Sequence, residues 1–230
     1  MEGLRYVIMP GQWPEKEKES VYREVYRCWE QTWTEAFNEL GKPPGFLKSD
    51  AFTRQDFIGA VFKENECLAL CFYRWADPKM ETFSKDSYFS NWGETHIMKL
   101  RSHGDHIIVC SNFTVAKNAR RTTLGFSMKD LLMGLVAKTF LHSGAEGMTA
   151  ALRRDRNVQG ACGKWGAEQI AYEVPSGHGD TVELMGFFHD VIASHPPQDL
   201  SGLVEELWES RMVVLDRREV YPLAELQKAA

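Results

Sequence analysis

The chain has 230 residues, 43% of them hydrophobic, so it can bury a full core as one large domain or as one domain with an appendage. Its formal net charge of −5 at pH 7 argues against general nucleic-acid binding, which usually leaves a basic excess, and we expect no nucleic-acid partner. The five cysteines are odd in number and show no paired Cys-x-x-Cys spacing, which indicates reduced core thiols in a cytoplasmic protein.

The first part of the chain predicts a strand and a long amphipathic helix. Leu4 to Met9 forms the expected strand, and no segment has the length and apolar content of a signal sequence or a membrane span. Ser20 is expected to cap a helix whose apolar side chains recur at helical spacing, namely Val21, Val25, Trp29, Trp33, Phe37 and Leu40. Core packing is the favoured role of its aromatic residues, and lining an acyl or acceptor pocket is the alternative for Tyr22, Tyr26 and Trp29.

A hairpin and a long insertion follow. Ile58 to Lys63 and Cys67 to Trp75 have the propensities of strands and are separated by a short polar turn. Asp77 to Asp105 then combines charge with the aromatic residues Phe83, Tyr88, Phe89 and Trp92. Near its end the insertion carries polar side chains whose spacing matches no common structural zinc pattern, so we expect no metal at His96, His103, Asp105 and His106.

The centre of the chain predicts a regular succession of elements. His106 to Val115 is an apolar run typical of a buried strand, and a polar turn with two arginines follows it. Apolar residues then recur at helical spacing from Met128 to Phe140, and Gly144 marks the expected end of that helix. The predicted strand, short helix and strand that come next span residues 147–152, 158–165 and 169–174.

The polar turn between the apolar run and the helix has the composition of an anion site. The first N–H groups of a helix have no partner within the helix, and the helix dipole adds partial positive charge there. Arg120 and Arg121 supply charge, Gly125 lets the backbone approach an anion, and hydroxyls come from Thr122, Thr123 and Ser127. The alternative is a solvated basic loop that caps the helix through Ser127.

With these elements in this order, residues 106–175 resemble the GCN5-related N-acetyltransferase (GNAT) superfamily. The matching positions are Val115 at the strand end, Arg121 with Gly125-Phe126-Ser127 in the turn, Asn157 at the short helix and Gly166-Ala167 after it. The resemblance implies that acetyl-CoA or another acyl-CoA is the co-substrate. It places the cofactor-binding residues at Phe113, Thr114, Val115, Arg120, Arg121, Thr122, Thr123, Leu124, Gly125, Phe126, Ser127 and Asn157.

The same resemblance implies an α+β fold, with a central mixed, mostly antiparallel sheet flanked by helices and an enlarged segment between the third and fourth strands. Residues 1–190 would form the acyltransferase domain, with a returning strand over Thr181 to Phe188. Residues 191–230 would form a helical tail, including a helix from about Ser201 to Met212. This tail would pack on the same domain or on a partner subunit, which leaves a homodimer possible.

The chemistry implied by the family is attack of an amine on a thioester. Backbone N–H groups near Phe113 to Val115 would polarise the thioester carbonyl, and a base must take a proton from the amine. Candidates for the base are Glu94, His96 and His106, with His103 and Asp105 beside them. Cys162 stands where many members have the tyrosine that protonates the leaving thiolate, so it is a catalytic candidate by position only.

The sequence therefore predicts an N-acyltransferase that moves an acyl group from acyl-CoA to a small-molecule primary amine. One alternative is a long-chain N-acyl amino acid synthase or autoinducer-type synthase that uses acyl carrier protein. Against it, the homoserine-lactone synthases carry Glu and Arg in the central strand where this chain has Val109 and Asn112. Another is a non-catalytic domain of the same fold that senses an acyl thioester. The basic run Arg153 to Arg156 either holds the adenosine 3′-phosphate or a carrier protein, or is a solvated turn.

Overall fold

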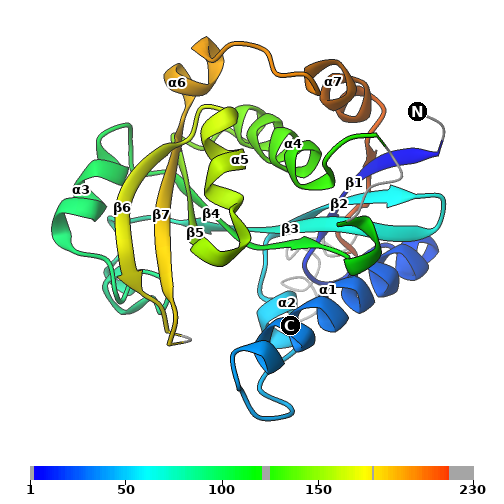
Figure 1. Ribbon diagram of the computed structural model, residues 1–230, viewed down its shortest axis with the longest axis horizontal. Helices are drawn as coiled ribbons and strands as arrows, with labels where there is room; N and C mark the ends of the chain where they lie inside the picture. The colour runs from blue at the N-terminus through cyan, green and yellow to red at the C-terminus, as the bar shows by residue number, and fades with distance from the viewer. Residues whose placement is uncertain (1–2, 121–124, 178, 218–230) are drawn as a thin grey trace, which may run out of the picture. The chain divides into compact units, whose positions relative to one another are not determined.

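The computed structural model describes residues 3–120, 125–177 and 179–217 and has the α+β architecture that the sequence predicts. Its eight described strands follow the order β6-β7-β5-β4-β3-β2-β1-β8, and antiparallel pairs predominate among them. The chain forms two compact units, and strands β3 (Glu66–Ala76) and β4 (Ile107–Val115) contribute to both. Helices accompany the strands in each unit (Figure 1).

Of the described residues, the first unit contains 3–73, 112–120, 125–128 and 206–217. In it β1 (Leu4–Pro10) pairs antiparallel with β2 (Phe57–Lys63), and β2 forms the predicted hairpin with β3. The short strand β8 (Met212–Val213) pairs parallel with β1. The helix predicted to reach Met212 therefore ends earlier, as α7 (Ser201–Glu209), because the chain turns to add a strand beside β1.

Helix α1 (Glu19–Glu39) covers the core of this unit. A 3-10 turn, η1 (Lys16–Lys18), leads directly into α1. The Lys18 N–H donates to the Glu15 carbonyl oxygen within this turn, and Lys18 occupies the N-cap position of α1. The predicted cap at Ser20 is wrong, because Ser20 already lies in the first helical turn. The predicted apolar face packs inward, with Val25 and Trp29 fully buried in a cluster that includes α2 (Asp50–Thr53) through Phe52. Core packing also accounts for the aromatic residues Tyr22, Tyr26 and Trp29, which all contact the Phe52 ring.

The second unit contains residues 74–111 and 129–205. Strand β5 (Gly147–Arg153) pairs parallel with β4 and antiparallel with β7 (Thr181–Phe188), which pairs with β6 (Glu168–Pro175). Helices α4 (Met128–Ser143), α5 (Val158–Lys164) and α6 (His189–Ser194) belong to this unit. Residues 131–137 of α4 are buried, and the helix ends as predicted at Gly144, whose φ of +78° favours glycine.

The insertion between β3 and β4 folds into a structured layer of the second unit. It holds a 3-10 turn, η2 (Glu81–Lys85), and the helix α3 (Glu94–Arg101). Its aromatic residues pack on buried residues of the strands, in a cluster with Ile107, Val109 and Phe188. The predicted enlarged segment between the third and fourth strands is thus confirmed.

The predicted boundary at residue 190 between a catalytic domain and a helical tail stays a prediction, since the two compact units do not test it. Residues 191–217 contribute part of α6, α7 and β8. None of the helices in the described ranges is long and apolar enough to cross a membrane.

Candidate functional site

Strand β4 is interrupted in its second half. Asn112 has a φ of +50°, in the left-handed region, whereas the sequence around it is a continuous run of strand-forming residues. Among residues with side chains, asparagine is one of those that adopt this conformation most readily. The conformation still costs on the order of 1–3 kcal/mol, so it persists only where the surrounding structure holds it.

Two tryptophans of α1 hold the interrupted segment. The Trp29 Nε1–H group donates a hydrogen bond to Asn112 Oδ1 at 2.9 Å, and Trp33 Nε1–H donates to Thr114 Oγ1 at 2.9 Å. The Thr114 hydroxyl in turn donates to the Asn112 carbonyl oxygen at 2.6 Å. We call these four residues the bulge network. It ties two successive turns of α1 to both sides of the break.

The break coincides with the end of regular pairing between β4 and β5. Their aligned residues run from Ile107 and Gly147 to Cys110 and Ala150, although both strands continue further. Within the first unit, the Ala116 N–H donates to the Leu68 carbonyl of β3. Since alternate N–H groups point to opposite edges of a strand, we expect those of Val115 and Phe113 to point away from β3. By this alternation the end of β4 would present backbone donors on the edge that does not pair with β3.

The turn after β4 begins with η3 (Lys117–Ala119) and the exposed Arg120. Arg120 Nε donates to the Val115 carbonyl at 3.0 Å, which anchors the guanidinium beside the strand end and leaves its other N–H groups able to bind an anion. Gly125 has a φ of +78°, which favours glycine, and no atom of the described residues lies within 4 Å of where a Cβ would stand. Ser127 directly precedes α4, as predicted for its N-cap. The predicted sites Arg121, Thr122, Thr123 and Leu124 lie outside the described residues.

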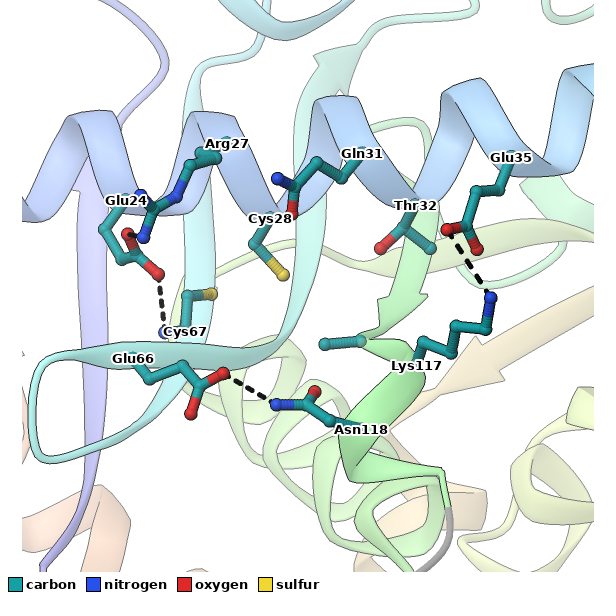
Figure 2. Close-up of a pocket in the computed structure, with 11 residues that line it drawn as sticks. Glu24, Arg27, Cys28, Gln31, Thr32, Glu35, Glu66, Cys67, Lys117 and Asn118 are labelled. Carbon is teal, nitrogen blue, oxygen red and sulfur yellow. Dashed lines mark hydrogen bonds and ion pairs between the residues drawn. The ribbon is translucent and has the colours of Figure 1, made fainter.

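A cavity of about 530 Å³ lies in the first unit, directly beside the residues that follow β4. Figure 2 shows side chains of α1 facing the start of β3 and the η3 turn. The lining residues are Glu24, Arg27, Cys28, Gln31, Thr32, Glu35, Glu66, Cys67, Ala116, Lys117 and Asn118. We call this the α1 pocket. Sequence reasoning missed it, because the polar stripe of α1 resembled a solvated helix face.

Three carboxylates and two cations line the α1 pocket, so its lining is net negative. Glu24 forms an ion pair with Arg27 and accepts the Cys67 N–H, and Glu35 lies 3.8 Å from Lys117. Glu66 accepts a hydrogen bond of 2.6 Å from the Asn118 amide, a neutral partner (Figure 2). The arrangement can attract a cationic group of a ligand.

The buried residues Cys28 and Cys67 contribute to the lining of the pocket. Both side chains are buried, and burial together with the neighbouring Cys28 thiol raises the pKa of Cys67 well above its ordinary value. Cys67 therefore stays a neutral thiol at physiological pH. This part of the lining is weakly polar, so the pocket combines charged residues with a surface suited to an alkyl group.

Comparison of the sequence with protein-family models finds no match, and comparison with curated proteins finds no significant relative. Comparison of the fold with solved structures does find matches. A CoA-dependent acyl-homoserine lactone synthase, BjaI, solved with SAM and isopentyl-CoA, aligns with a TM-score of 0.55 at 11% identity, over 89% of this chain and 100% of that one. FeeM, an N-acyl amino acid synthase from uncultured soil microbes, aligns with a TM-score of 0.51 at 11% identity, over 87% of this chain and 97% of that one.

A putative N-acetyltransferase from Lactobacillus plantarum aligns with a TM-score of 0.50 at 9% identity, over 81% of this chain and 99% of that one. The chain has a GNAT-like fold. At these identities the likeness concerns the fold alone. The resemblance noted in the sequence is thereby confirmed at the level of the fold.

The structure shows what the predicted catalytic residues contact. His96 Nδ1 accepts the Gly93 N–H at 3.2 Å and so caps α3, while Glu94 is exposed in the first turn of that helix. His106 stacks on Trp75 with ring centroids 4.4 Å apart. It precedes β4, whereas Phe113 to Val115 close the same strand, so these predicted residues lie at opposite ends of β4. The catalytic role of each stays a prediction.

Cys162 and Asn157 belong to the α5 region of the GNAT fold. Cys162 is fully buried, its sulfur lies 3.6 Å from the Met133 sulfur, and burial raises the pKa of its thiol well above the ordinary value. Asn157 precedes α5 with a φ of +48°, and its carbonyl oxygen accepts a hydrogen bond from Lys129 Nζ at 2.9 Å. Lys129 in the first turn of α4 is therefore linked to the start of α5.

The arginines at the end of β5 and just after it form ion pairs with neighbouring carboxylates. Arg153 lies 2.7 Å from Asp155, and Arg154 pairs with Glu173 and with the buried Glu183. These pairs favour the interpretation of a structured surface turn over that of a phosphate or carrier-protein site. Among the described residues there is no group of three or more His, Cys, Asp or Glu side chains arranged to hold a metal ion.

Proposed function

We propose that this protein transfers an acyl group from the thioester of an acyl-CoA to a primary amine by direct attack. The observation that carries the proposal is the break in β4 at Asn112, in a chain with the GNAT fold. The break leaves the strand end with Phe113 and Val115 N–H groups directed away from β3, and such backbone donors can stabilise the negative charge that develops on a carbonyl oxygen.

The turn that follows β4 supports binding of the pyrophosphate of coenzyme A. Arg120 is anchored at Val115, and the N–H groups at the start of α4 lack helical partners. Since Gly125 has no side chain, phosphate oxygens can come close to its backbone. Arg121, Thr122, Thr123 and Leu124 belong to the same proposed site on sequence grounds. Bound acyl-CoA would supply the activated acyl group, and these residues would fix its position.

The α1 pocket is the proposed place of the amine acceptor. It opens beside Ala116, the residue that follows the strand end, and its lining carries an excess of carboxylates. A primary amine is protonated at neutral pH, so such a pocket concentrates the substrate by attraction. Glu66 is the carboxylate best placed to bind the ammonium group, since its partner in the structure is the neutral Asn118 amide.

The reaction forms a C–N bond to the acyl carbon and breaks its C–S bond, and the electron pair of the C–S bond leaves with the thiolate. The amine must lose a proton before or during attack, which requires a base or a relay of water molecules. Glu94, His96 and His106 remain the candidates proposed from the sequence, and Cys162 remains a candidate by position.

Long-chain transfer from acyl carrier protein is the second candidate. The aromatic layer formed by the insertion favours it, because an apolar layer beside β4 can accommodate a long acyl chain. The solved structures of similar fold include both a CoA-dependent lactone synthase and an N-acyl amino acid synthase. The CoA-dependent reaction is the first choice because the Arg120 turn accounts for a pyrophosphate.

The proposal is tested by steady-state kinetics with acetyl-CoA, a long-chain acyl-CoA and a long-chain acyl carrier protein, each against a panel of primary amines. Glu66→Gln is expected to raise the KM for the amine about tenfold with little change in the KM for the donor, since one charge-assisted contact is lost. Glu64→Gln, in the turn just outside the pocket, is the matched control and should leave both unchanged. Turnover with the carrier protein alone would favour the second candidate. Ligand binding without turnover by any donor would favour a sensing domain.

A further inference from the structure

Thr114 is the buried polar residue at the centre of the bulge network in the first unit. It is 1% exposed, and its hydroxyl oxygen accepts the Trp33 Nε1–H at 2.9 Å. The same hydroxyl donates to the Asn112 carbonyl oxygen at 2.6 Å, which a carbonyl can only accept. The hydroxyl proton is therefore directed to the backbone of β4 itself.

Trp33 of α1 sets the direction of this proton. An indole N–H can only donate, so it takes a lone pair of the Thr114 oxygen and the hydroxyl proton must point elsewhere. The Trp33 ring is itself held by packing on Phe37, with ring centroids 5.6 Å apart. A chain of two hydrogen bonds thus runs from α1 through one hydroxyl to the main chain of β4.

The carbonyl at the end of this chain belongs to the peptide unit that carries the Phe113 N–H. That peptide bond is trans, and a trans peptide unit is planar, with its C=O and N–H groups pointing in opposite directions. A hydrogen bond that fixes the Asn112 C=O therefore also fixes the Phe113 N–H. This N–H points away from the Thr114 hydroxyl.

The two tryptophans of the bulge network hold different groups of Asn112. Trp29 binds its side-chain oxygen at 2.9 Å, whereas Trp33 acts on its main-chain carbonyl through Thr114. Asn112 needs such support because its φ of +50° is a conformation that persists only where the surroundings hold it. Of the two tryptophans, Trp33 is the one whose hydrogen bonds lead to the peptide unit of the Phe113 N–H.

We propose that Trp33 and Thr114 are positioning residues that orient the Phe113 N–H toward the carbonyl oxygen of the acyl thioester. The inference rests on the proposed acyl transfer and names the side chains that prepare its backbone donor. Negative charge grows on this oxygen as the amine forms the C–N bond, and the C=O bond re-forms as the C–S electron pair leaves with the thiolate. A donor that is oriented before the reaction stabilises this charge without a cost of reorganisation. Trp33 and Thr114 exchange no proton with the substrate.

The test begins with single variants in steady-state kinetics with acetyl-CoA and an amine that wild type acetylates. Trp33→Phe keeps a ring but loses the N–H donor, and Thr114→Val keeps the shape but loses the hydroxyl. Each should lower kcat about tenfold, less than the roughly 100-fold cost of removing an oxyanion donor, with both KM values within about twofold of wild type. Thr114→Ser keeps the hydroxyl and should recover kcat to within about threefold of wild type. Thr34→Val, at an exposed threonine of α1, is the control and should keep wild-type kcat.

A double variant separates positioning from general damage to the packing. Because both residues act through the Asn112 carbonyl, Trp33→Phe/Thr114→Val should be no slower than Thr114→Val alone. Two unconnected defects would instead multiply, to a loss in kcat of about 100-fold. Binding gives a second measurement, with acetyl-CoA and with its thioether analogue, which lacks the carbonyl. Wild type should prefer acetyl-CoA about tenfold, and Trp33→Phe should lose most of that preference.

Three results would each overturn the inference while the proposed function stands. They are wild-type kcat in Trp33→Phe and Thr114→Val, an equal loss in Thr114→Ser and Thr114→Val, and multiplied losses in the double variant. If Thr114→Val does not fold, the preference of Trp33→Phe for the carbonyl decides, and an unchanged preference contradicts the inference. If folded wild type forms no amide with any donor, the proposed function fails and the inference fails with it.

Discussion

Trp29 of α1 donates a hydrogen bond from its indole N–H to the side-chain oxygen of Asn112 at 2.9 Å, across 83 positions of sequence. This bond joins the central helix of the first unit to the residue at which β4 leaves strand geometry. A fully buried tryptophan usually needs a partner for its N–H, and Asn112 provides it. The packing of α1 and the break in β4 are therefore linked by a hydrogen bond.

Substitutions at Asn112 separate its side-chain bond from its backbone conformation. Asn112→Ala loses both and is expected to destabilise the protein by about 1–3 kcal/mol, because the Trp29 N–H is left buried without its partner. Asn112→Gly tolerates the positive φ and should be less destabilising than alanine. Urea unfolding gives both values, with the exposed Asn38→Ala in α1 as a control expected within about 0.5 kcal/mol of wild type. Equal stability of all three variants would show that the break in β4 does not depend on this residue.

A pair of glycine substitutions tests the backbone of the phosphate turn. Gly125→Ala is expected to destabilise the protein by roughly 1 kcal/mol, since its φ of +78° is unfavourable for alanine although no atom of the described residues obstructs the side chain. Gly163→Ala in α5 also meets no atom within 4 Å, but it lies in a helix and should stabilise by up to about 1 kcal/mol. Thermal unfolding compares the two. The same sign for both would contradict the assigned conformation of Gly125.

The buried thiols of Cys67 and Cys162 are expected to lower the free energy of unfolding as the pH rises into the alkaline range. Burial raises the pKa of Cys162, and burial with the adjacent Cys28 thiol raises that of Cys67. Above the unfolded thiol pKa of about 8.5, the folded chain retains protons that the unfolded chain releases, so the free energy of unfolding decreases as pH rises towards the folded pKa. Each thiol contributes up to roughly 1.4 kcal/mol per pH unit in that window.

This slope is measured by urea unfolding between pH 7.5 and pH 9.5. Cys162→Ala should show a shallower decline than wild type, although it starts from lower stability. Met133→Leu, which alters the packing beside Cys162 without removing a titratable group, should keep the wild-type slope. An unchanged slope in Cys162→Ala would mean that this thiol titrates alike in the folded and unfolded chain.

Arg120 provides a prediction for the donor. Its guanidinium is held at the Val115 carbonyl, so Arg120→Ala removes a positioned charge without removing a buried side chain. We expect the dissociation constant for acetyl-CoA to rise about tenfold with unchanged unfolding temperature. The exposed Arg54→Ala is the matched control and should bind as wild type does. Calorimetric titration with acetyl-CoA measures the dissociation constants of both variants. Equal affinities would mean that Arg120 does not bind the pyrophosphate.

The elements with strong local signals could be predicted from the sequence. Helix α4 follows from its apolar spacing and from Gly144, and the hairpin of β2 and β3 from two strand-forming runs around a polar turn. The predicted start of α1 at Ser20 is wrong. Serine is a preferred capping residue, but the 3-10 turn η1 runs directly into α1, so the helix already begins at Glu19.

The features of the site that were missed depend on contacts distant in sequence. Asn112 lies in an apolar run that predicts an unbroken strand, and its conformation depends on Trp29, which the helical pattern marks only as core. The α1 pocket forms where one face of a helix meets the ends of two strands, so no local pattern marks it.

Acyl transfer itself is tested most directly by mass spectrometry of the products formed from isotopically labelled acetyl-CoA and a mixture of primary amines. We expect a labelled N-acetyl amine and free CoA in equal amounts, both dependent on enzyme and on the amines. Absence of labelled amide from acetyl-CoA, from long-chain acyl-CoA and from acyl carrier protein, by protein that is folded and binds these donors, would contradict the claim that this chain is an N-acyltransferase.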